Sequence, residues 1–178
     1  MKIYVEDIIH FPLDTVFSTY RDNLPELSSY LPNIDAITQE EREELEDGSV
    51  KLLNVWKASP TEIPKIVRPF IDPNAISWKD YAHWDHANLT CEWRMELSIF
   101  SDHISVKGLN RFEPKGEDAV KFIINGELSV DAKKIPGVPR LLAGRIGPAI
   151  EKFVITLITP NLKGVNRGLE KLIRDRAS

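Results

Sequence analysis

The chain has 178 residues, of which 42% are hydrophobic and 28% are charged, and its formal net charge is −4. A hydrophobic fraction of this size excludes a disordered chain, and the length predicts one folded domain over residues 1–178. The acidic balance argues against nucleic acid as a partner, because phosphate binding needs a surplus of Lys and Arg on one face.

The sequence predicts a soluble protein of the cytoplasm. Its one cysteine, Cys91, cannot form an internal disulfide, and its position in a strand-like pattern predicts a buried thiol. No uninterrupted apolar stretch approaches the roughly 20 residues that span a bilayer. The opening residues 1–5 also lack the charged start and the long apolar run of a signal peptide.

The N-terminal part of the chain is predicted to form a strand followed by two short helices. Residues 2–11 are rich in β-branched and aromatic residues, which favours a strand that Pro12 ends. Residues 12–20 change to helical spacing, with the proline in the first turn, where its missing donor does no harm. A second short helix is predicted around residues 24–30, before Pro32.

Six further strands are predicted from the alternation of apolar and polar residues. The dipeptide Asp47-Gly48 is a hairpin signal. The proline-rich stretch 60–69 is predicted to be a mobile loop or a loop at the rim of a cavity. The six strands are expected at residues 34–46, 49–58, 76–84, 89–97, 104–113 and 119–131.

The last part of the chain, residues 138–177, is predicted to form one long, interrupted helix. An apolar stripe begins at Leu141 and Leu142 and continues at steps of three and four residues. Pro148 and Pro160 each remove a backbone donor, so a kink or a restart is expected at each. Because propensity alone cannot stabilise such a helix, its apolar stripe must pack against the predicted strands.

This order of elements predicts a layered α+β fold. Antiparallel hairpins dominate, and one face of the sheet is apolar throughout. A curved, seven-stranded antiparallel sheet wrapped around the C-terminal helix would bury both apolar surfaces, with the two short helices placed after the first strand.

The element order, together with three local patterns, resembles the helix-grip fold of the START and Bet v 1-like superfamily. The patterns are a helix start at Pro12–Phe17, a Leu-Pro segment at Leu31–Ile34 and a hairpin at Glu46–Gly48. This SRPBCC superfamily includes polyketide cyclase-like and dehydratase relatives and lipid-transfer proteins. The resemblance implies an apolar cavity between the sheet and the last helix. It carries over no catalytic residue, because the superfamily shares none.

The expected inward face of the sheet is apolar but is interrupted by Asn54, Asp80 and Asn110. A few polar groups in an apolar concavity are typical of a small-molecule site, and Gly108 and Gly126 would leave it space. Equally, the polar groups could bond one another or buried water, and the glycines could mark bulges in the sheet. The predicted ligand-binding residues are Asn54, Trp56, Trp78, Asp80, Trp93, Asn110, Phe122 and Phe153.

Asp80 is the one candidate catalytic residue. A carboxylate among tryptophans would have its pKa raised by desolvation, and it could then act as a general base. If the register is off by one residue, Lys79 or Arg94 would pair with it instead. His83 and His86 do not form a metal pair, because this spacing on a strand end does not bring both rings to one side. No metal and no cofactor are predicted.

Three functions follow from these observations. The first is binding or transport of a hydrophobic molecule, such as a lipid, a polyketide or an isoprenoid-like compound, without catalysis. The second is a cyclase or dehydratase that uses Asp80 with Asn54 or Asn110. The third is a membrane-surface module in which the basic segment after Pro160 lies on anionic lipid. The basic residues of that segment are Lys163, Arg167, Lys171, Arg174 and Arg176.

Overall fold

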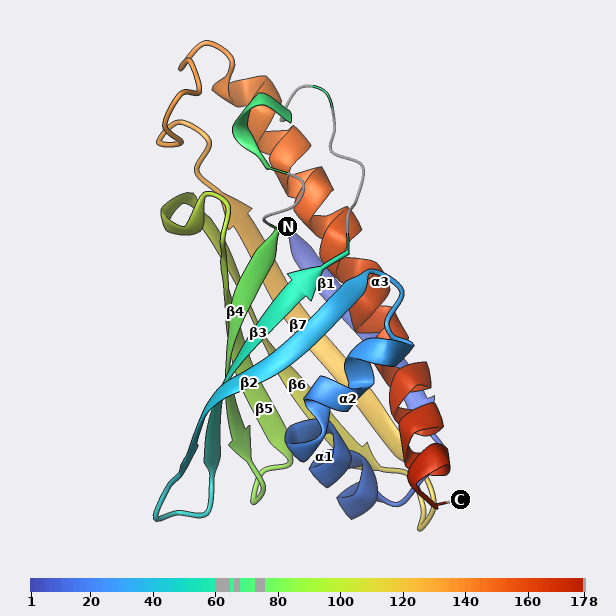
Figure 1. Ribbon diagram of the computed structural model, residues 1–178. Helices are drawn as coiled ribbons and strands as arrows, with labels where there is room; N and C mark the ends of the chain where they lie inside the picture. Colours follow the sequence, from blue (N-terminus) through green and yellow to red (C-terminus); the bar gives the residue numbers. More distant parts are fainter. Residues whose placement is uncertain (60–64, 66–67, 73–75, 178) are drawn as a thin grey trace.

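The seven predicted strands and the C-terminal helix are all present, and they form a curved antiparallel sheet that grips the helix (Figure 1). The computed structural model describes residues 1–59, 65, 68–72 and 76–177. The strands are β1 Lys2–Ile9, β2 Ile34–Glu44, β3 Val50–Ala58, β4 Ser77–Asp85, β5 Thr90–Leu97, β6 Ile104–Pro114 and β7 Val120–Val130. The α-helices are α1 Leu13–Asp22, α2 Leu24–Leu27 and α3 Ala143–Ala177, and the 3-10 turns are η1 Ser28–Tyr30, η2 Arg68–Phe70 and η3 Ser101–His103.

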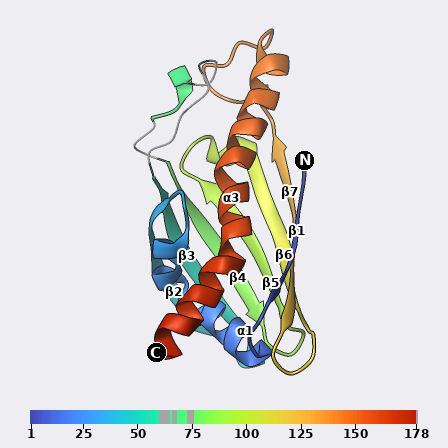
Figure 2. The same ribbon diagram turned by 90° about the vertical axis from the view of Figure 1, so that its right-hand side faces the viewer.

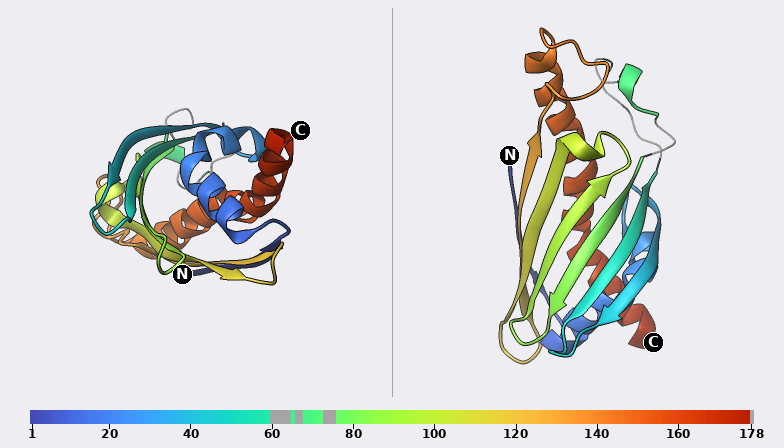
Figure 3. Two further views of the ribbon diagram at one scale, coloured as in Figure 1. Left: turned by 90° about the horizontal axis from the view of Figure 1, so that it is seen from below. Right: turned by 90° about the vertical axis from the view of Figure 1, so that its left-hand side faces the viewer.

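The strand order in the sheet is β1-β7-β6-β5-β4-β3-β2, with every neighbouring pair antiparallel. Strands β2 to β7 follow one another as sequential neighbours. The two short helices separate β1 from β2, and β1 instead pairs with β7 at the opposite edge of the sheet. Seen end-on, the sheet curls around α3 and the short helices, which lie on its concave side (Figure 3, left). From the side, α3 runs across the concave face of the sheet (Figure 2).

The predicted inward face is the buried face of the sheet. All five alternate residues of β3, from Val50 to Ala58, are buried. In the pairing of β3 with β4, Asn54 lies opposite Asp80 and Trp56 opposite Trp78. A register slip of one residue would have turned these side chains to solvent, so the pairing of Asp80 with Lys79 or Arg94 does not occur.

The long helix differs from its prediction at its start. Residues 139–142 form a turn, in which the amide of Leu142 donates to the carbonyl of Pro139, and α3 begins only at Ala143. Leu141 and Leu142 therefore do not belong to the buried stripe. The side chain of Leu141 is 97% exposed and that of Leu142 is 45% exposed.

Of the kink or restart expected at each proline, the restart does not occur, because α3 runs through both prolines as one helix of 35 residues. A proline leaves the carbonyl four residues earlier without its helical donor. Those carbonyls belong to Gly144 and Thr156, which are exposed residues, so water can bond them. The helix tolerates Pro148 and Pro160 because neither lies on its buried face.

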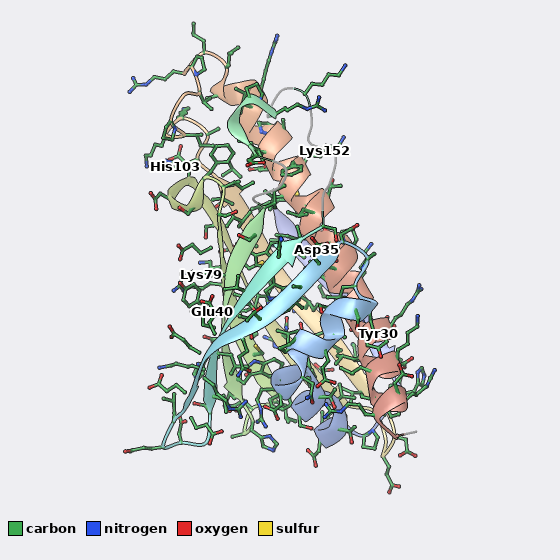
Figure 4. All side chains as sticks on the ribbon, in the orientation of Figure 1. Tyr30, Asp35, Glu40, Lys79, His103 and Lys152 are labelled. Atoms are coloured by element: carbon green, nitrogen blue, oxygen red, sulfur yellow. The ribbon has the colours of Figure 1, made fainter. Side chains whose placement is uncertain are left out.

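The C-terminal half of α3 packs against the short helices. A β-carbon added to Gly168 would lie 2.8 Å from the Cδ1 of Leu27, and one added to Gly164 would lie 3.3 Å from the Cδ2 of Leu31. The side chains of the short helices thus fit against these glycines. Tyr30 donates from its hydroxyl to Asp175 near the end of α3, at 2.6 Å (Figure 4).

The predicted loop at residues 60–69 falls largely outside the described residues, which exclude 60–64 and 66–67. Its described part includes η2, which is followed by the buried Ile71.

Candidate functional site

A small inner pocket lies between the concave face of the sheet and α3. It has a volume of about 30 Å³. One water needs roughly 10–15 Å³ measured in this way, so the pocket has room for about two or three waters. Its polar lining residues are Tyr20, Asn54, Asp80, Asn110 and Asn161. The remaining lining residues are Leu24, Trp56, Trp78, Ala82, Trp84, Cys91, Trp93, Met95, Ile158, Leu162 and Val165.

Six of the eight predicted ligand-binding residues line this pocket, namely Asn54, Trp56, Trp78, Asp80, Trp93 and Asn110. The other two, Phe122 and Phe153, are buried in the core and are not among its lining residues. Phe122 belongs to an aromatic cluster under α1, where its ring centroid is 5.7 Å from that of Tyr20. In this structure both phenylalanines therefore belong to the hydrophobic core and not to the lining of the pocket.

The space above Gly108 and Gly126 is filled, contrary to the expectation that it enlarges a cavity. The two glycines lie opposite each other in β6 and β7, and Trp93 is the partner of Gly108 on β5. A β-carbon on Gly108 would come within 2.3 Å of the Trp93 ring, and one on Gly126 within 2.9 Å. The register continues through both glycines, so they do not mark bulges either. They accommodate the Trp93 indole.

Hydrogen bonds fix some of the polar groups around the pocket. The indole N–H of Trp93 donates to Asn110 Oδ1 at 2.8 Å. Asn161, on α3, donates from its side-chain amide to the carbonyl of Leu157 at 2.9 Å. The amide of Asn54 donates to Asp80 Oδ2 at 3.5 Å, which is long for such a bond. Asp80 is therefore held only weakly by its neighbour.

Other polar atoms around the pocket have no hydrogen-bond partner among the described residues. They include the side-chain oxygens of Asn54 and Asn161. They also include the indole nitrogens of Trp56, Trp78 and Trp84. Buried polar groups are nearly always bonded, because an unbonded one costs about 1–3 kcal/mol. Five such atoms belong to residues that line one small pocket, so we expect a water or a ligand to bond them.

Burial controls the ionisation of the groups at the pocket. Desolvation raises the pKa of Asp80 to about 6, against the opposing effects of the Asn54 amide and the Trp56 indole N–H. The Trp56 indole N–H lowers the pKa of Asp80 although the two groups do not form a hydrogen bond. Desolvation also raises the pKa of the Tyr20 hydroxyl and of the Cys91 thiol. The thiol is therefore a buried, protonated group, as its strand position indicates.

Two of the five polar lining residues, Tyr20 and Asn161, were not among the predicted site residues. Tyr20 comes from α1, and the helical spacing that predicted its buried face could not show that it reaches the pocket. Asn161 follows Pro160, where a break in the helix was expected. Its position on the buried face of α3 was therefore not predicted. The signal that could have found it is a polar residue at an apolar position of a helical stripe.

The outer face of the sheet has a second concavity, an open groove of about 1420 Å³ that crosses all seven strands. Paired charges line it, such as Lys107 with Glu127 at 3.0 Å. The guanidinium of Arg94 lies 3.7 Å from the ring centroid of Tyr81. Ligand pockets bury most of the surface of their ligand, and this groove is open to solvent along the sheet, so it lacks that property.

The described residues contain no group of three or more His, Cys, Asp or Glu side chains that could hold a metal ion. His83 bonds the hydroxyl of Ser49 at 3.1 Å, while His86 lies edge-on to the ring of Phe17. No helix among the described residues is long and apolar enough to cross a bilayer.

No protein-family model matches the chain, and no curated protein is similar to it in sequence. Solved structures match it over its whole length. A protein of Thermus thermophilus is 21% identical, with a TM-score of 0.67, and the match covers 100% of both chains. The Zhui aromatase/cyclase of Streptomyces sp. R1128 is 12% identical, with a TM-score of 0.64, and the match covers 96% of this chain and 94% of that one.

A norcoclaurine synthase of Thalictrum flavum is 19% identical, with a TM-score of 0.61, and the match covers 100% of this chain and 96% of that one. A START superfamily protein of Mycobacterium smegmatis also matches, with a TM-score of 0.57. At these identities the likeness concerns the fold. Together with the curved seven-stranded sheet and the long terminal helix, it shows that the chain has the helix-grip fold of the START and Bet v 1-like proteins.

Proposed function

We propose that the chain binds a small, mainly apolar molecule that carries a hydroxyl or carbonyl group in the inner pocket. The observation that carries this proposal is the set of five buried, unpartnered polar atoms on Asn54, Asn161 and three tryptophans. The indole N–H groups can donate to a ligand oxygen, and the amide oxygens and Asp80 can accept from a hydroxyl. The tryptophans supply apolar contact area around them.

The similar structures support a small-molecule role for this fold. The structural matches include an aromatase/cyclase and a norcoclaurine synthase, the latter in complex with a transition state analogue. Both names are those of enzymes. For this chain, binding is the part of that role that the lining residues favour most directly.

The pocket must expand to admit a ligand, since 30 Å³ is far below the roughly 300–1,000 Å³ of typical ligand sites. The wall that can move is α3, because the strands that form the opposite wall are hydrogen-bonded to one another. Ile158, Leu162 and Val165 close the pocket from α3, and Pro160 lies between Ile158 and Leu162 in the sequence, on a different face of the helix. A proline weakens the helical ladder at this point, so opening is expected there.

The tryptophan side chains give a direct test. The chain has four tryptophans, and all four line the pocket, so every indole N–H signal in a nitrogen-proton correlation spectrum reports from it. Titration with 2-naphthol should shift the signals of Trp56, Trp78 and Trp84, whose N–H groups lack partners among the described residues. Naphthalene, which has no hydroxyl, should bind more weakly.

The matched variants are Asn54→Leu in the pocket and Asn125→Leu on the outer face of the sheet. The first should weaken 2-naphthol binding, and the second should not. Indole signals that stay unmoved up to the solubility limit of 2-naphthol would contradict the proposal. Mass spectrometry of the freshly purified protein under native conditions, followed by organic extraction, would then identify a natural ligand.

A second candidate function is an enzyme of the cyclase or dehydratase type, favoured by the raised pKa of Asp80, to about 6. At neutral pH such a carboxylate is ionised and is a stronger base than an exposed aspartate. Bound 2-acetylnaphthalene in heavy water should then exchange its methyl protons, and Asp80→Asn should abolish this exchange while leaving binding nearly intact. Exchange at the same rate in the variant would exclude Asp80 as the base.

A further inference from the structure

The end of the molecule at the start of α3 carries an exposed surface that we call the basic tip. It consists of Lys133, Lys134, Arg140, Leu141, Leu142 and Arg145. These residues lie in the turns between β7 and α3 and in the first turn of α3, which project beyond the end of the sheet (Figure 1). The inner pocket plays no part in this surface: Ile158, the first α3 residue in the pocket, lies about 20 Å further along the helix axis.

The tip exposes two adjacent leucines. Leu141 is 97% exposed and Leu142 is 45% exposed, and the only other large hydrophobic side chains exposed among the described residues are Met1 and Tyr4. The turn that presents the leucines is held by the hydrogen bond from the Leu142 amide to the Pro139 carbonyl, at 2.8 Å. A folded protein seldom leaves neighbouring large aliphatic side chains in water unless they meet a partner.

Exposed basic residues occur in the same stretch of the chain as these leucines. Between residues 132 and 150 the sequence has four basic residues and no acidic one, in a chain whose net charge is −4. Lys134 pairs with Asp131 at 3.0 Å on the exposed surface, a pair of little strength. Lys133, Arg140 and Arg145 are exposed and form no ion pair with a described residue. The nearby Lys152 also projects from α3 away from the sheet (Figure 4).

We propose that the basic tip docks on an anionic phospholipid bilayer, with Leu141 and Leu142 entering the headgroup region. Exposed apolar side chains ringed by cations are the chemical signature of an interfacial membrane contact. The cations attract the negative leaflet, and the leucines gain by leaving water. A nucleic acid would bond the same cations but would gain nothing from the leucines.

The C-terminal segment of α3, which the sequence also offered for membrane contact, lacks these properties. Its apolar residues Val165, Leu169 and Leu172 are buried against the rest of the fold. Its charges are partly neutralised, since Arg174 pairs with Glu170 and Arg176 with Glu26, each at 3.7 Å. The segment would have to leave the core before it could present an apolar face to lipid.

The test is co-sedimentation of the full chain with vesicles of phosphatidylcholine alone and of phosphatidylcholine mixed with phosphatidylglycerol. The wild type should sediment with the mixed vesicles only, and less at high salt. Each basic side chain near an anionic surface contributes about fivefold to the partition coefficient. Arg140→Glu with Arg145→Glu should therefore weaken partitioning more than about twentyfold, and Leu141→Ser with Leu142→Ser should weaken it strongly without changing the net charge.

The matched control is Arg167→Glu with Lys171→Glu, which makes the same change in charge on exposed positions of the C-terminal segment. It should partition nearly as the wild type does. Three results would overturn the proposal: no binding of the wild type to the mixed vesicles, an equal loss in the control, or full binding after the leucine substitutions. The last result would indicate a purely electrostatic contact, such as one with nucleic acid. All altered residues are exposed, and circular dichroism checks that the variants fold.

Discussion

Asp80 is a carboxyl group whose ionisation is opposed by its burial, and this makes the stability of the fold depend on pH. Its pKa is raised from 3.8 to about 6 in the folded state. Between these values the folded chain holds a proton that the unfolded chain has lost, so the contribution of Asp80 to stability is most favourable below about pH 4 and falls as the pH rises to about 6. The full effect is on the order of 3 kcal/mol.

Replacing Asp80 by Asn should remove this dependence. Urea unfolding of Asp80→Asn should give a higher free energy of unfolding than the wild type above pH 6, and the gain should shrink toward pH 4. Asp7→Asn, at an exposed position of β1, is the control and should follow the wild-type curve. The two free energies of unfolding could instead differ by the same amount at every pH. That result would rule out the ionisation of Asp80 as the cause of the difference.

Gly108 has a structural role that can be measured. A β-carbon there would come within 2.3 Å of both the Trp93 ring and the backbone carbonyl oxygen of Asn125. Gly108→Ala should therefore destabilise the fold by about 1–3 kcal/mol or more, with a change in tryptophan fluorescence as Trp93 moves. Gly144→Ala is the matched control: nothing lies within 4 Å of its added carbon, and a helical alanine should be neutral or stabilising. A fully stable Gly108→Ala variant would contradict the close fit.

The pattern of residues in the strands predicted much of the site, because alternation determines which face of a strand is buried. The sequence pattern therefore placed three polar residues on the inward face of the sheet, namely Asn54, Asp80 and Asn110. The same pattern could not show whether the space above a glycine is open or filled, since that depends on the rotamer of Trp93 on the neighbouring strand. Nor could it assign Phe122 to the cluster with Tyr20 instead of the pocket.

At the scale of elements, α3 was predicted in type and in its C-terminal end, but its start and the effect of its prolines were misjudged. Whether a proline breaks a helix depends on which face it occupies and on whether the released carbonyl meets water. The sequence shows which face of α3 a proline occupies only after the buried residues of the helix have been identified. Leu141 and Leu142 fitted the stripe by spacing alone, and the turn at Pro139 takes them out of it.

Pro160 is expected to be the point at which α3 opens the pocket. Pro160→Ala would restore a donor to the Thr156 carbonyl and should stabilise the helix by up to about 3 kcal/mol. If opening occurs there, 2-naphthol should also associate more slowly, as measured by stopped-flow tryptophan fluorescence. Pro148→Ala, about 18 Å away along the helix, should stabilise without slowing association. Unchanged association with Pro160→Ala would place the opening elsewhere.

At the scale of the whole molecule, the fold consists of two layers that differ in how they are held. The sheet is joined by hydrogen bonds from β1 at one edge to β2 at the other, and the pairing of β1 with β7 links segments far apart in the sequence. The helix α3 is held on the sheet mainly through its buried apolar face. Local opening should therefore occur between the layers, at the pocket, before the sheet itself unfolds.

Hydrogen exchange can distinguish a local opening around Pro160 from a movement of α3 as a rigid body. A ligand slows only those openings that release it, by about a hundredfold at a ligand concentration about 100 times its Kd. With 2-naphthol bound, amides of residues 158–165 should slow by this factor, whereas amides of residues 144–150 should exchange as before through their own local fraying. If both segments slowed equally, α3 would move as one body, and the proline would not be the hinge.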